Sequence, residues 1–480
     1  MTISPVRQIL SAVCSLHGWA VSLFIVLLAT LLAILPFPNL PVLRHSLLLL
    51  FVLLVVFRCS GWSVRFLHEP LVALWVGFLF IFPLLTADAS STLVNMGRQW
   101  WPAGLALMAT SLVGRMAVPG WRDEGLCLVL GLASAVPLML HLGMVLFVWC
   151  GVLPASVGFW SGDGGPAQIQ SAAPGSIEAF PWGYWGVHLH HADIGYAALQ
   201  SVVLLMAAGR SMTGKARARL AIPLMLCLIC PLISHSRAGV IFVLLAMFGL
   251  PAIWILSTYQ SRQWKTLAGL AAVALVLAGG LLMFAGHTDG RWLGMVNRLA
   301  QGFSGDPQVL YCEGQEAYGA RLKLERPELS PIDLADIQTK VANGDGTRVA
   351  LARIGLDLVL EHPLGIDGSK QSFEKALRQR CAQPAILMAH SHNGWIDTAL
   401  ALGWLGGLLY FLLLGSFFLT GWRALSMDGR QNTWALVLAG LSLLWIARGV
   451  FDSVYRDHML LMQALVLGFA YAQVRARLQS

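Results

Sequence analysis

Two histidines and an asparagine stand directly before one of the long apolar runs of the sequence. His390, His392 and Asn393 lie within Met-Ala-His-Ser-His-Asn-Gly-Trp at residues 388–395. An imidazole with its ordinary pKa of about 6.5 can accept a proton at neutral pH, so His392 is a candidate base that would activate an alcohol. His390 and Asn393 are candidate binding residues beside it. The alternative is structural, with these residues capping the helix or joining a hydrogen-bonded interface.

Two arginines have the chemistry of a diphosphate site. Arg237 lies in Ser-His-Ser-Arg-Ala-Gly at residues 234–239, a short polar break between two apolar runs. Its guanidinium keeps its charge and donates two hydrogen bonds in a fixed fork, which suits a diphosphate. Arg348 stands at the start of a predicted helix, where the backbone N–H groups of the first turn would add donors for the same anion. An ordinary surface cation is the alternative for Arg348.

A second histidine cluster, formed by His188, His190 and His191 with Asp193, could suggest a metal site. Spacings of one and two residues do not bring imidazoles onto one face of a helix, so interfacial hydrogen bonding is the favoured interpretation. A single further acid, Asp88, is weak support for a metal elsewhere. The sequence has no phosphate loop of the Walker type, and we predict neither a metal nor a cofactor.

The elements that must position these residues are membrane-spanning helices. Of the 480 residues, 57% are hydrophobic and 12% are charged, against about a quarter charged in a soluble protein. This apolar surplus exceeds what an aqueous core could hide, so lipid is the solvent for most of the chain. We predict an all-α polytopic protein with about twelve transmembrane helices. They are expected at residues 17–36, 40–57, 70–86, 101–118, 125–150, 188–209, 219–234, 238–257, 264–286, 395–418, 432–448 and 457–474.

The distribution of basic residues predicts the orientation of these spans. Lys and Arg accumulate in short cytoplasmic loops of membrane proteins, so the net charge of +8 does not indicate a nucleic-acid partner. With both termini cytoplasmic, fifteen of the twenty basic residues outside residues 287–391 fall on the cytoplasmic side. The long segment and the aromatic loop at residues 151–187 then lie on the opposite side, which is the periplasm if the cell is a Gram-negative bacterium.

Five arginines depart from this pattern and lie toward the periplasmic face. An arginine is costly at membrane depth unless it is paired, so the set suggests an anionic ligand at that face. Arg98 and Arg448, with Arg291 in the long segment, are therefore candidate binding residues. Alternatively, Arg98 snorkels to the headgroups, and Arg448 pairs with Asp452. The five arginines are Arg44, Arg98, Arg237, Arg448 and Arg456.

The long periplasmic segment is expected to have a largely helical structure of its own. We divide the chain into residues 1–286 with nine spans, the segment 287–394, and residues 395–480 with three spans. Helices are predicted over 347–361 and 371–380, because strong helix formers precede a proline and a glycine-punctuated turn follows it. Glycines in that turn would let the backbone lie close to a ligand or to another loop.

Cys312 and Cys381 are the cysteines of this segment. Two cysteines in an oxidising compartment favour a disulfide, whereas a zinc site would need four ligands. The bond would close a loop of about 70 residues and contribute on the order of 4 kcal/mol in the chain-entropy model.

In combination these motifs resemble the signature region of the O-antigen ligase and polymerase superfamily. The resemblance is carried by Ser-Arg-Ala-Gly at residues 236–239, by Arg348, by His-Pro-Leu-Gly-Ile-Asp-Gly at 362–368 and by His-Ser-His-Asn at 390–393, followed by a helix with Gly-Trp-Leu-Gly-Gly at 403–407. The hydropathy pattern is similar to the family across the whole chain, and specific residues match from about 230 to 410.

The resemblance implies a metal-independent glycosyltransferase with a C-type fold, in the bacterial inner membrane, with its active site facing the periplasm. The donor would be a polysaccharide on undecaprenyl diphosphate, and the acceptor of the ligase is a sugar of the lipid A core. His392 would deprotonate the acceptor hydroxyl, while Arg237 and Arg348 would hold the diphosphate and stabilise its charge as it leaves. Attack opposite the leaving group implies inversion at the anomeric carbon.

Other functions share part of this pattern. Polymerases and protein O-oligosaccharyltransferases of the superfamily have the same segment and His-Asn pair, and the ligase is favoured by the modest length and the single large segment late in the chain. A polysaccharide flippase is the alternative from another class. Transporters tend to show internal repeats and charges at mid-membrane, whereas the unusual polar residues here cluster at one face. The expected partners are the two lipid substrates and membrane lipids.

Overall fold

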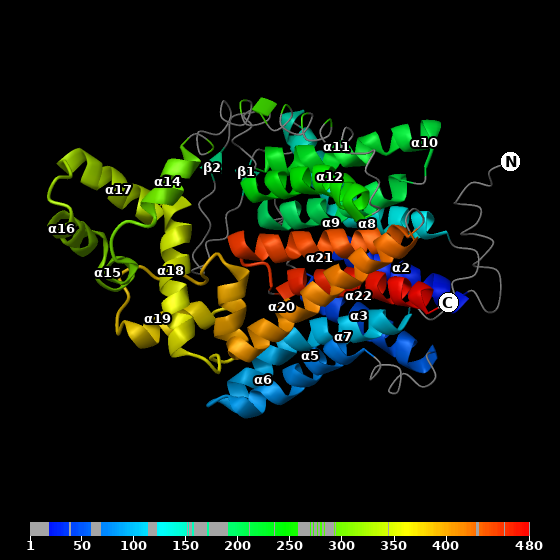
Figure 1. The fold of residues 1–480 in the computed structure, drawn as a ribbon, viewed down its shortest axis with the longest axis horizontal. Coiled ribbons are helices and arrows are strands. Elements are labelled where there is room, and N and C mark those ends of the chain that lie inside the picture. The colour runs from blue at the N-terminus through cyan, green and yellow to red at the C-terminus, as the bar shows by residue number, and fades with distance from the viewer. Residues whose placement is uncertain are drawn as a thin grey trace.

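The computed structural model shows a bundle of long helices with a smaller helical unit at one end (Figure 1). It describes residues 19–37, 40–58, 69–113, 122–150, 191–210, 212–234, 236–257, 294–343, 345–428, 432–455 and 457–479, with a few short stretches between them.

Eleven of the predicted spans coincide with helices of the structure, and the ninth, at 264–286, lies largely outside the described residues. Within the described part of the chain, seven helices are long and apolar enough to cross a membrane, and four shorter apolar helices accompany them. The all-α polytopic class is therefore confirmed, while the number of spans stays a prediction. The helices of the bundle are α2 (Trp19–Ile34), α3 (Pro41–Arg58), α5 (Pro70–Ile81), the 3-10 helix η1 (Phe82–Leu85), α6 (Ala89–Arg98), α7 (Trp100–Val113), α8 (Asp123–Trp149), α9 (His191–Gly209), α10 (Gly214–Arg219), α11 (Ala221–Ile233), α12 (Arg237–Ser257), α20 (Gly394–Asp428), α21 (Thr433–Phe451) and α22 (Asp457–Leu478).

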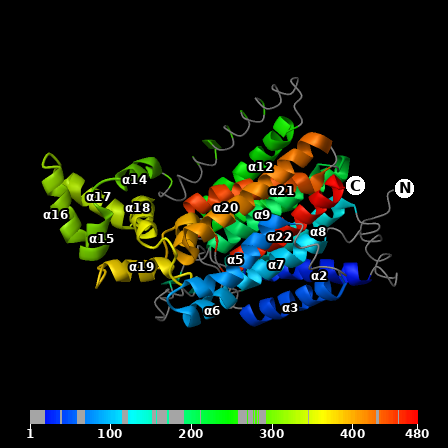
Figure 2. The same ribbon diagram turned by 60° about the horizontal axis from the view of Figure 1, so that its bottom comes forward.

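Helices α9 and α21 lie inside the bundle. The N-terminal helices α2, α3 and α5 to α7 form one side of it and α11 with α12 the other (Figures 1 and 2). α9 packs against α8, α11, α12 and α21, and α21 also packs against α20 and α22. Polar groups on such enclosed helices need partners within the protein, and the Ser201 hydroxyl of α9 has one, since it donates to Gly131 O at 2.8 Å.

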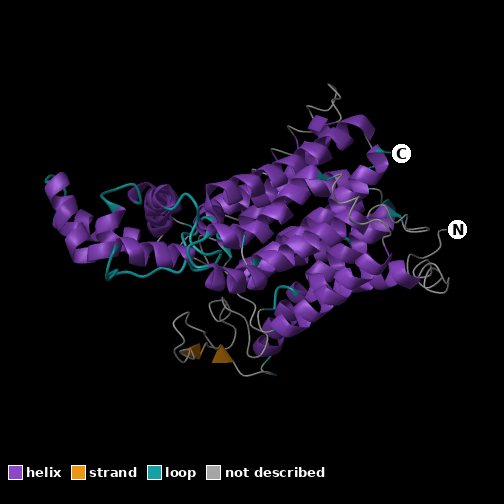
Figure 3. Ribbon diagram, turned by 90° about the horizontal axis from the view of Figure 1, so that it is seen from below, coloured by secondary structure: helices purple, strands orange, loops and turns teal. Residues whose placement is uncertain are grey.

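The predicted periplasmic segment contains six described helices, which are α14 (Met295–Gln301), α15 (Pro307–Glu313), α16 (Gln315–Glu325), α17 (Pro331–Asn343), α18 (Asp345–Glu361) and α19 (Ser372–Arg380). We call these helices the outer unit. The unit has its own apolar core, which includes Leu351, Leu358 and Phe373 and extends to Ile396 of α20. Loops connect the helices of this unit, and many of them lie where the unit meets the end of the bundle (Figure 3). Helices were predicted over 347–361 and 371–380, and α18 and α19 confirm both within two residues.

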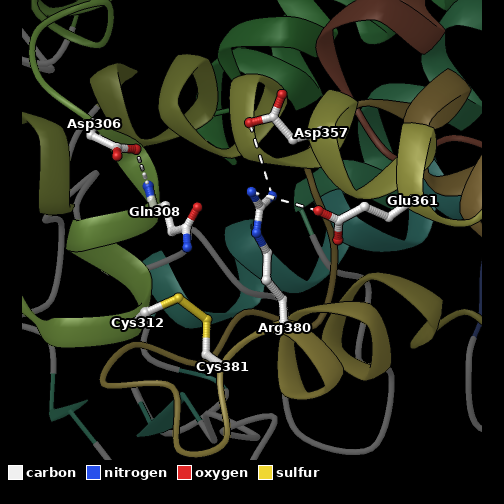
Figure 4. The surroundings of a disulfide bond; sticks show 7 residues. All are labelled: Asp306, Gln308, Cys312, Asp357, Glu361, Arg380 and Cys381. Atoms are coloured by element: carbon white, nitrogen blue, oxygen red, sulfur yellow. Dashed lines mark hydrogen bonds and ion pairs between the residues drawn. A yellow bond between two sulfur atoms is a disulfide. The ribbon is translucent and has the colours of Figure 1, made fainter.

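A disulfide links α15 of the outer unit to the residue that follows α19. Cys312, at the end of α15, is bonded to Cys381, which directly follows α19, across a sequence separation of 69 residues (Figure 4). The neighbouring Arg380 reaches α18, with Nη1 3.9 Å from Asp357 and Nη2 3.6 Å from Glu361. The disulfide and these ion pairs therefore hold α15, α18 and α19 together.

The turn after α18 is inserted into a break in α20. Gly365 and Gly403 both have left-handed backbones, with φ of 76° and 75°. At the break, the Trp404 N–H donates to Pro363 O at 2.9 Å, and Leu400 O accepts from Ile366 N at 2.9 Å. The glycine-punctuated turn was predicted to approach a ligand or a loop. It approaches the backbone of a bundle helix instead, because Gly403 opens that helix.

Two short strands, β1 (Ser156–Val157) and β2 (Gln170–Ser171), pair antiparallel within the predicted aromatic loop. Most of that loop lies outside the described residues.

Candidate active site

The His-Ser-His-Asn turn is held between the start of α20 and the end of α21. Asn393 caps α20, since its Oδ1 accepts from the N–H groups of Trp395 at 3.0 Å and Ile396 at 3.1 Å. Its Nδ2 donates to Val450 O at 3.0 Å. The side chain of Asn393, which was predicted to bind substrate, thus fixes the turn itself, and with it the backbone of His392.

His392 has a strained backbone. Its φ is 57°, and it is the one residue other than glycine with a positive φ in the described part of the chain. Such a conformation costs about 1–3 kcal/mol and persists where the surroundings impose it, which is frequent at functional sites. The half-buried ring of His392 lies 4.3 Å from that of His390, measured between ring centroids. The turn therefore presents both imidazoles side by side.

Asp452 directly follows α21 and lies close to the turn. Its backbone oxygen accepts from Gly394 N at 3.0 Å, and its Oδ2 accepts from the Tyr196 hydroxyl at 2.8 Å. Burial by itself would raise the pKa of this carboxyl group, but Arg448, Arg348 and the Tyr196 hydroxyl lower it to about 2, with a further contribution from His392. Asp452 is thus a fixed negative charge beside the candidate base.

Arg448 is fully buried in the last turn of α21. Its Nη1 donates to Gly195 O at 2.9 Å, and its guanidinium lies 3.9 Å from the ring centroid of Tyr196. A Cβ at residue 195 would lie 3.0 Å from Gly239 Cα of α12 and 2.9 Å from Arg448 Nη2, so the close approach of α9 and α12 beside Arg448 requires glycine there. The pairing with Asp452 that the sequence left open as an alternative is indirect, because Tyr196 stands between the two groups.

Arg237, at the first position of α12, forms a two-pronged ion pair with Asp345 at the start of α18. Its Nη1 donates to Oδ2 at 2.9 Å and its Nη2 to Oδ1 at 2.6 Å. Arg298 of α14 donates from Nε to the same Oδ2 at 3.1 Å. Although burial raises the pKa of Asp345, the two arginines outweigh it and lower the pKa below its ordinary value. The carboxylate is therefore ionised at neutral pH.

Arg348 lies one turn further along α18. It is half-buried, and its Nη1 donates a long hydrogen bond of 3.4 Å to Phe451 O, the last residue of α21. Asp345 binds the first residue of α12, and Arg348 contacts the last residue of α21. Helix α18 therefore lies across one end of the bundle, as Figure 1 shows. The structure thus brings Arg237, Arg348 and His392 to one end of the bundle.

Other predicted residues lie elsewhere. Arg98 is exposed at the end of α6, a helix that contacts the turn after α18 through Asn95, whose Nδ2 donates to Asp367 O at 3.1 Å. Asp88 caps the same helix by accepting from Ser91 N at 3.1 Å, a bond that lowers the pKa of its carboxyl group. Among the described residues no three His, Cys, Asp or Glu side chains are grouped as for a metal.

Some predictions lie outside the described residues: Arg291, Arg456, His188, His190 and the side chain of His191. The remaining acid of that histidine cluster, Asp193, pairs with His458 Nε2 of α22 at 2.8 Å.

Sequence reasoning did not assign Tyr196, Arg298 or Asp345 to the site. Asp345 precedes Arg348 by one helical turn and so could have been noticed. Tyr196 is an aromatic residue inside an apolar helix and gives no signal in a single sequence.

Residues 222–411 match the family described as O-antigen ligase. This match includes Arg237, the outer unit and the His-Ser-His-Asn turn, and it confirms the resemblance to the O-antigen ligase superfamily. It ends before Arg448 and Asp452 and begins after Tyr196. No protein among the curated sequences matches the chain.

Proposed function

Because residues 222–411 carry the domain of the O-antigen ligase superfamily, whose members are glycosyltransferase-like membrane enzymes, we propose that this chain is an O-antigen ligase. It transfers a polysaccharide from undecaprenyl diphosphate to a sugar hydroxyl of the lipid A core. It lies in the inner membrane with both termini in the cytoplasm, and the active site faces the periplasm. The described end of α22, at the far end of the bundle from the outer unit, supports this orientation (Figure 1).

In the proposed reaction, an imidazole nitrogen of His392 accepts the proton of the acceptor hydroxyl as its oxygen attacks the anomeric carbon of the donor. A bond forms between that oxygen and the carbon, and the bond from the carbon to the diphosphate oxygen breaks. The products are lipopolysaccharide with an inverted anomeric centre and undecaprenyl diphosphate. The ionised Asp452 supports this role, because a nearby negative charge stabilises the imidazolium that forms.

The departing diphosphate is bound by Arg237 and Arg348 in this proposal. Cations fixed before the reaction stabilise the developing negative charge without reorganisation, so no metal is needed for this step. The first turn of α18 carries both Asp345, which binds Arg237 of α12, and Arg348, which contacts the last residue of α21.

The observation that carries the proposal is the convergence of the candidate base and both arginines at one end of the bundle, within the matched region. The test is reconstitution of the purified protein with lipid-linked polysaccharide and either lipid A core or a second donor molecule. Transfer to the core supports the ligase. Chain doubling without transfer would instead assign a polymerase, and movement of the donor across the bilayer without transfer would assign a flippase.

A further inference from the structure

Asp345 has no part in the proposed reaction, yet it binds the arginine that the reaction uses. Its carboxylate is 7% exposed and accepts from Arg237 at 2.6 and 2.9 Å. Its Oδ2 is shared with Arg298 Nε at 3.1 Å. One carboxylate therefore lies between two guanidinium groups, of which one comes from the bundle and the other from the outer unit.

The backbone of the outer unit is shaped to make this contact. α14 crosses the start of α18 at two glycines, and a Cβ on Gly302 would lie 2.5 Å from Gly346 O. A Cβ on Gly346 would lie 2.9 Å from Arg298 O. Any side chain at either position would separate the two helices and move Arg298 away from Asp345. The close packing of α14 on α18 thus fixes the second arginine.

The same helix carries Arg348, one turn after Asp345, with its Nη1 3.4 Å from Phe451 O. A helix is stiff over one turn, so fixing Asp345 on α12 also fixes where Arg348 projects over the end of α21. Binding a flexible arginine in advance removes part of the ordering that ligand binding would otherwise require. The fork of a guanidinium must also be aimed correctly, because its donors have fixed directions.

We propose that Asp345 is the positioning residue of the diphosphate site. It acts through Arg237, which it aims, and through α18, which it anchors so that Arg348 faces the same anion, with Arg298 as the second support of its carboxylate. This inference rests on the proposed function, since it concerns the arginines of the donor site.

The test uses the purified full-length protein and undecaprenyl diphosphate as the probe. Asp345→Asn keeps the shape of the side chain and removes the charge that both arginines bind. We expect its affinity for the probe to fall roughly tenfold or more, which is the scale seen when a residue that orients a metal-binding side chain is lost. The donor KM should rise while the acceptor KM stays unchanged, and Asp345→Glu should recover part of the affinity.

The matched control is Asp357→Asn, an acid-to-amide change on the exposed face of the same helix, where the side chain lies 3.9 Å from Arg380. It should bind the probe as the parent does. If Asp345→Asn does not fold, Arg298→Gln removes one support and leaves the contact with Arg237. It should lower affinity for the probe in the same direction, and equal affinity would then overturn the proposal.

The outcomes are separable. If the parent binds the probe and Asp345→Asn binds it equally or more tightly, Asp345 is not a positioning residue, and the proposed function stands. A rise in the acceptor KM as large as that in the donor KM would show a general distortion and would also overturn the inference. If the parent does not bind the probe, the proposed function fails, and this inference fails with it.

Discussion

The guanidinium of Arg448 lies 3.9 Å from the centre of the Tyr196 ring, and the hydroxyl of that ring donates to Asp452 at 2.8 Å. A buried cation and an ionised acid are thus joined through one aromatic side chain. The hydroxyl satisfies the acid and the ring face attracts the cation, so each charge is stabilised without direct contact between them. This arrangement places the negative charge of Asp452 next to the His392 turn.

His392→Ala should abolish transfer. A general base contributes about 10²–10⁴-fold to a rate, so in cells lipid-linked polysaccharide should accumulate and capped lipopolysaccharide should disappear. The measurement is the polysaccharide ladder on a gel, beside the expression level of the variant. His45→Ala, at an exposed position of α3, is the control and should give a normal ladder. A normal ladder from well-expressed His392→Ala would refute the assignment of the base.

Arg348→Ala should weaken donor binding with little loss of stability. The side chain is half-buried and its hydrogen bond to Phe451 O is long, at 3.4 Å, so we expect the free energy of unfolding to change by less than about 1 kcal/mol. Affinity for undecaprenyl diphosphate should fall about tenfold, because a charge-assisted hydrogen bond to the ligand contributes roughly 1.5–3 kcal/mol. Arg321→Ala is the control, because it removes the same positive charge at an exposed position of α16, and it should bind undecaprenyl diphosphate as the parent does. Unchanged affinity in detergent would remove Arg348 from the site.

Arg237→Ala should differ from Arg348→Ala in its effect on folding. Asp345 would keep Arg298 and lose the two-pronged partner, so the variant should be destabilised as well as weakened in donor binding. Thermal unfolding in detergent and binding of undecaprenyl diphosphate measure the two effects. Donor binding equal to that of the parent would show that Arg237 has only its structural contact.

The charge of Asp452 predicts a pH dependence of stability. Its pKa in the folded protein is about 2, below the ordinary value of about 3.9. The stability it contributes is therefore fully present above about pH 4 and is lost as the pH falls toward 2. Asp452→Asn should have a lower Tm than the parent at neutral pH, and the difference should shrink below about pH 4. A difference that grew at low pH would contradict this account.

Gly403→Ala should destabilise the protein. A Cβ there would lie 2.7 Å from Leu364 C, and a φ of 75° with a ψ of 175° is a conformation that essentially only glycine adopts, so backbone strain adds to the clash. Gly415→Ala, later in the same helix and with no heavy atom within 4 Å of a built Cβ, is the control and should unfold at or above the parent's temperature. Thermal unfolding in detergent compares them. Equal unfolding temperatures for Gly403→Ala and the parent would mean that the turn is not held in the break.

The sequence identified site residues most readily where a charged or polar residue stands beside an apolar, membrane-spanning run. Arg237 and His392 each stand beside an apolar run, which marks them in a single sequence. Asp345 belongs to a segment with many acids, so only its three-dimensional neighbours distinguish it. The spans were found from apolar length, yet α20 was predicted to end at 418 and continues to Asp428, because no proline interrupts it and helix formation does not require lipid.

The sequence predicts that the glycine-punctuated turn can approach another group closely, but it does not predict that this group is the backbone of α20. Glycine allows close approach, but hydropathy does not identify the neighbour, and Gly403 gives no sign in the sequence that its helix opens there. Similarly, Arg448 was expected at the membrane face for its charge. Its stacking on Tyr196 depends on the approach of α9 at Gly195, a relationship between distant segments.

The exchange of backbone hydrogen bonds between the turn and α20 also determines where foreign sequence can be inserted. A reporter placed between residues 362 and 371 to map topology would break the contacts that close α20, and a negative signal would reflect misfolding. Residues 326–330, the mostly exposed connection between α16 and α17, lie at the far side of the outer unit. An epitope or protease site there would report which side of the membrane the outer unit occupies without touching the helices that hold His392.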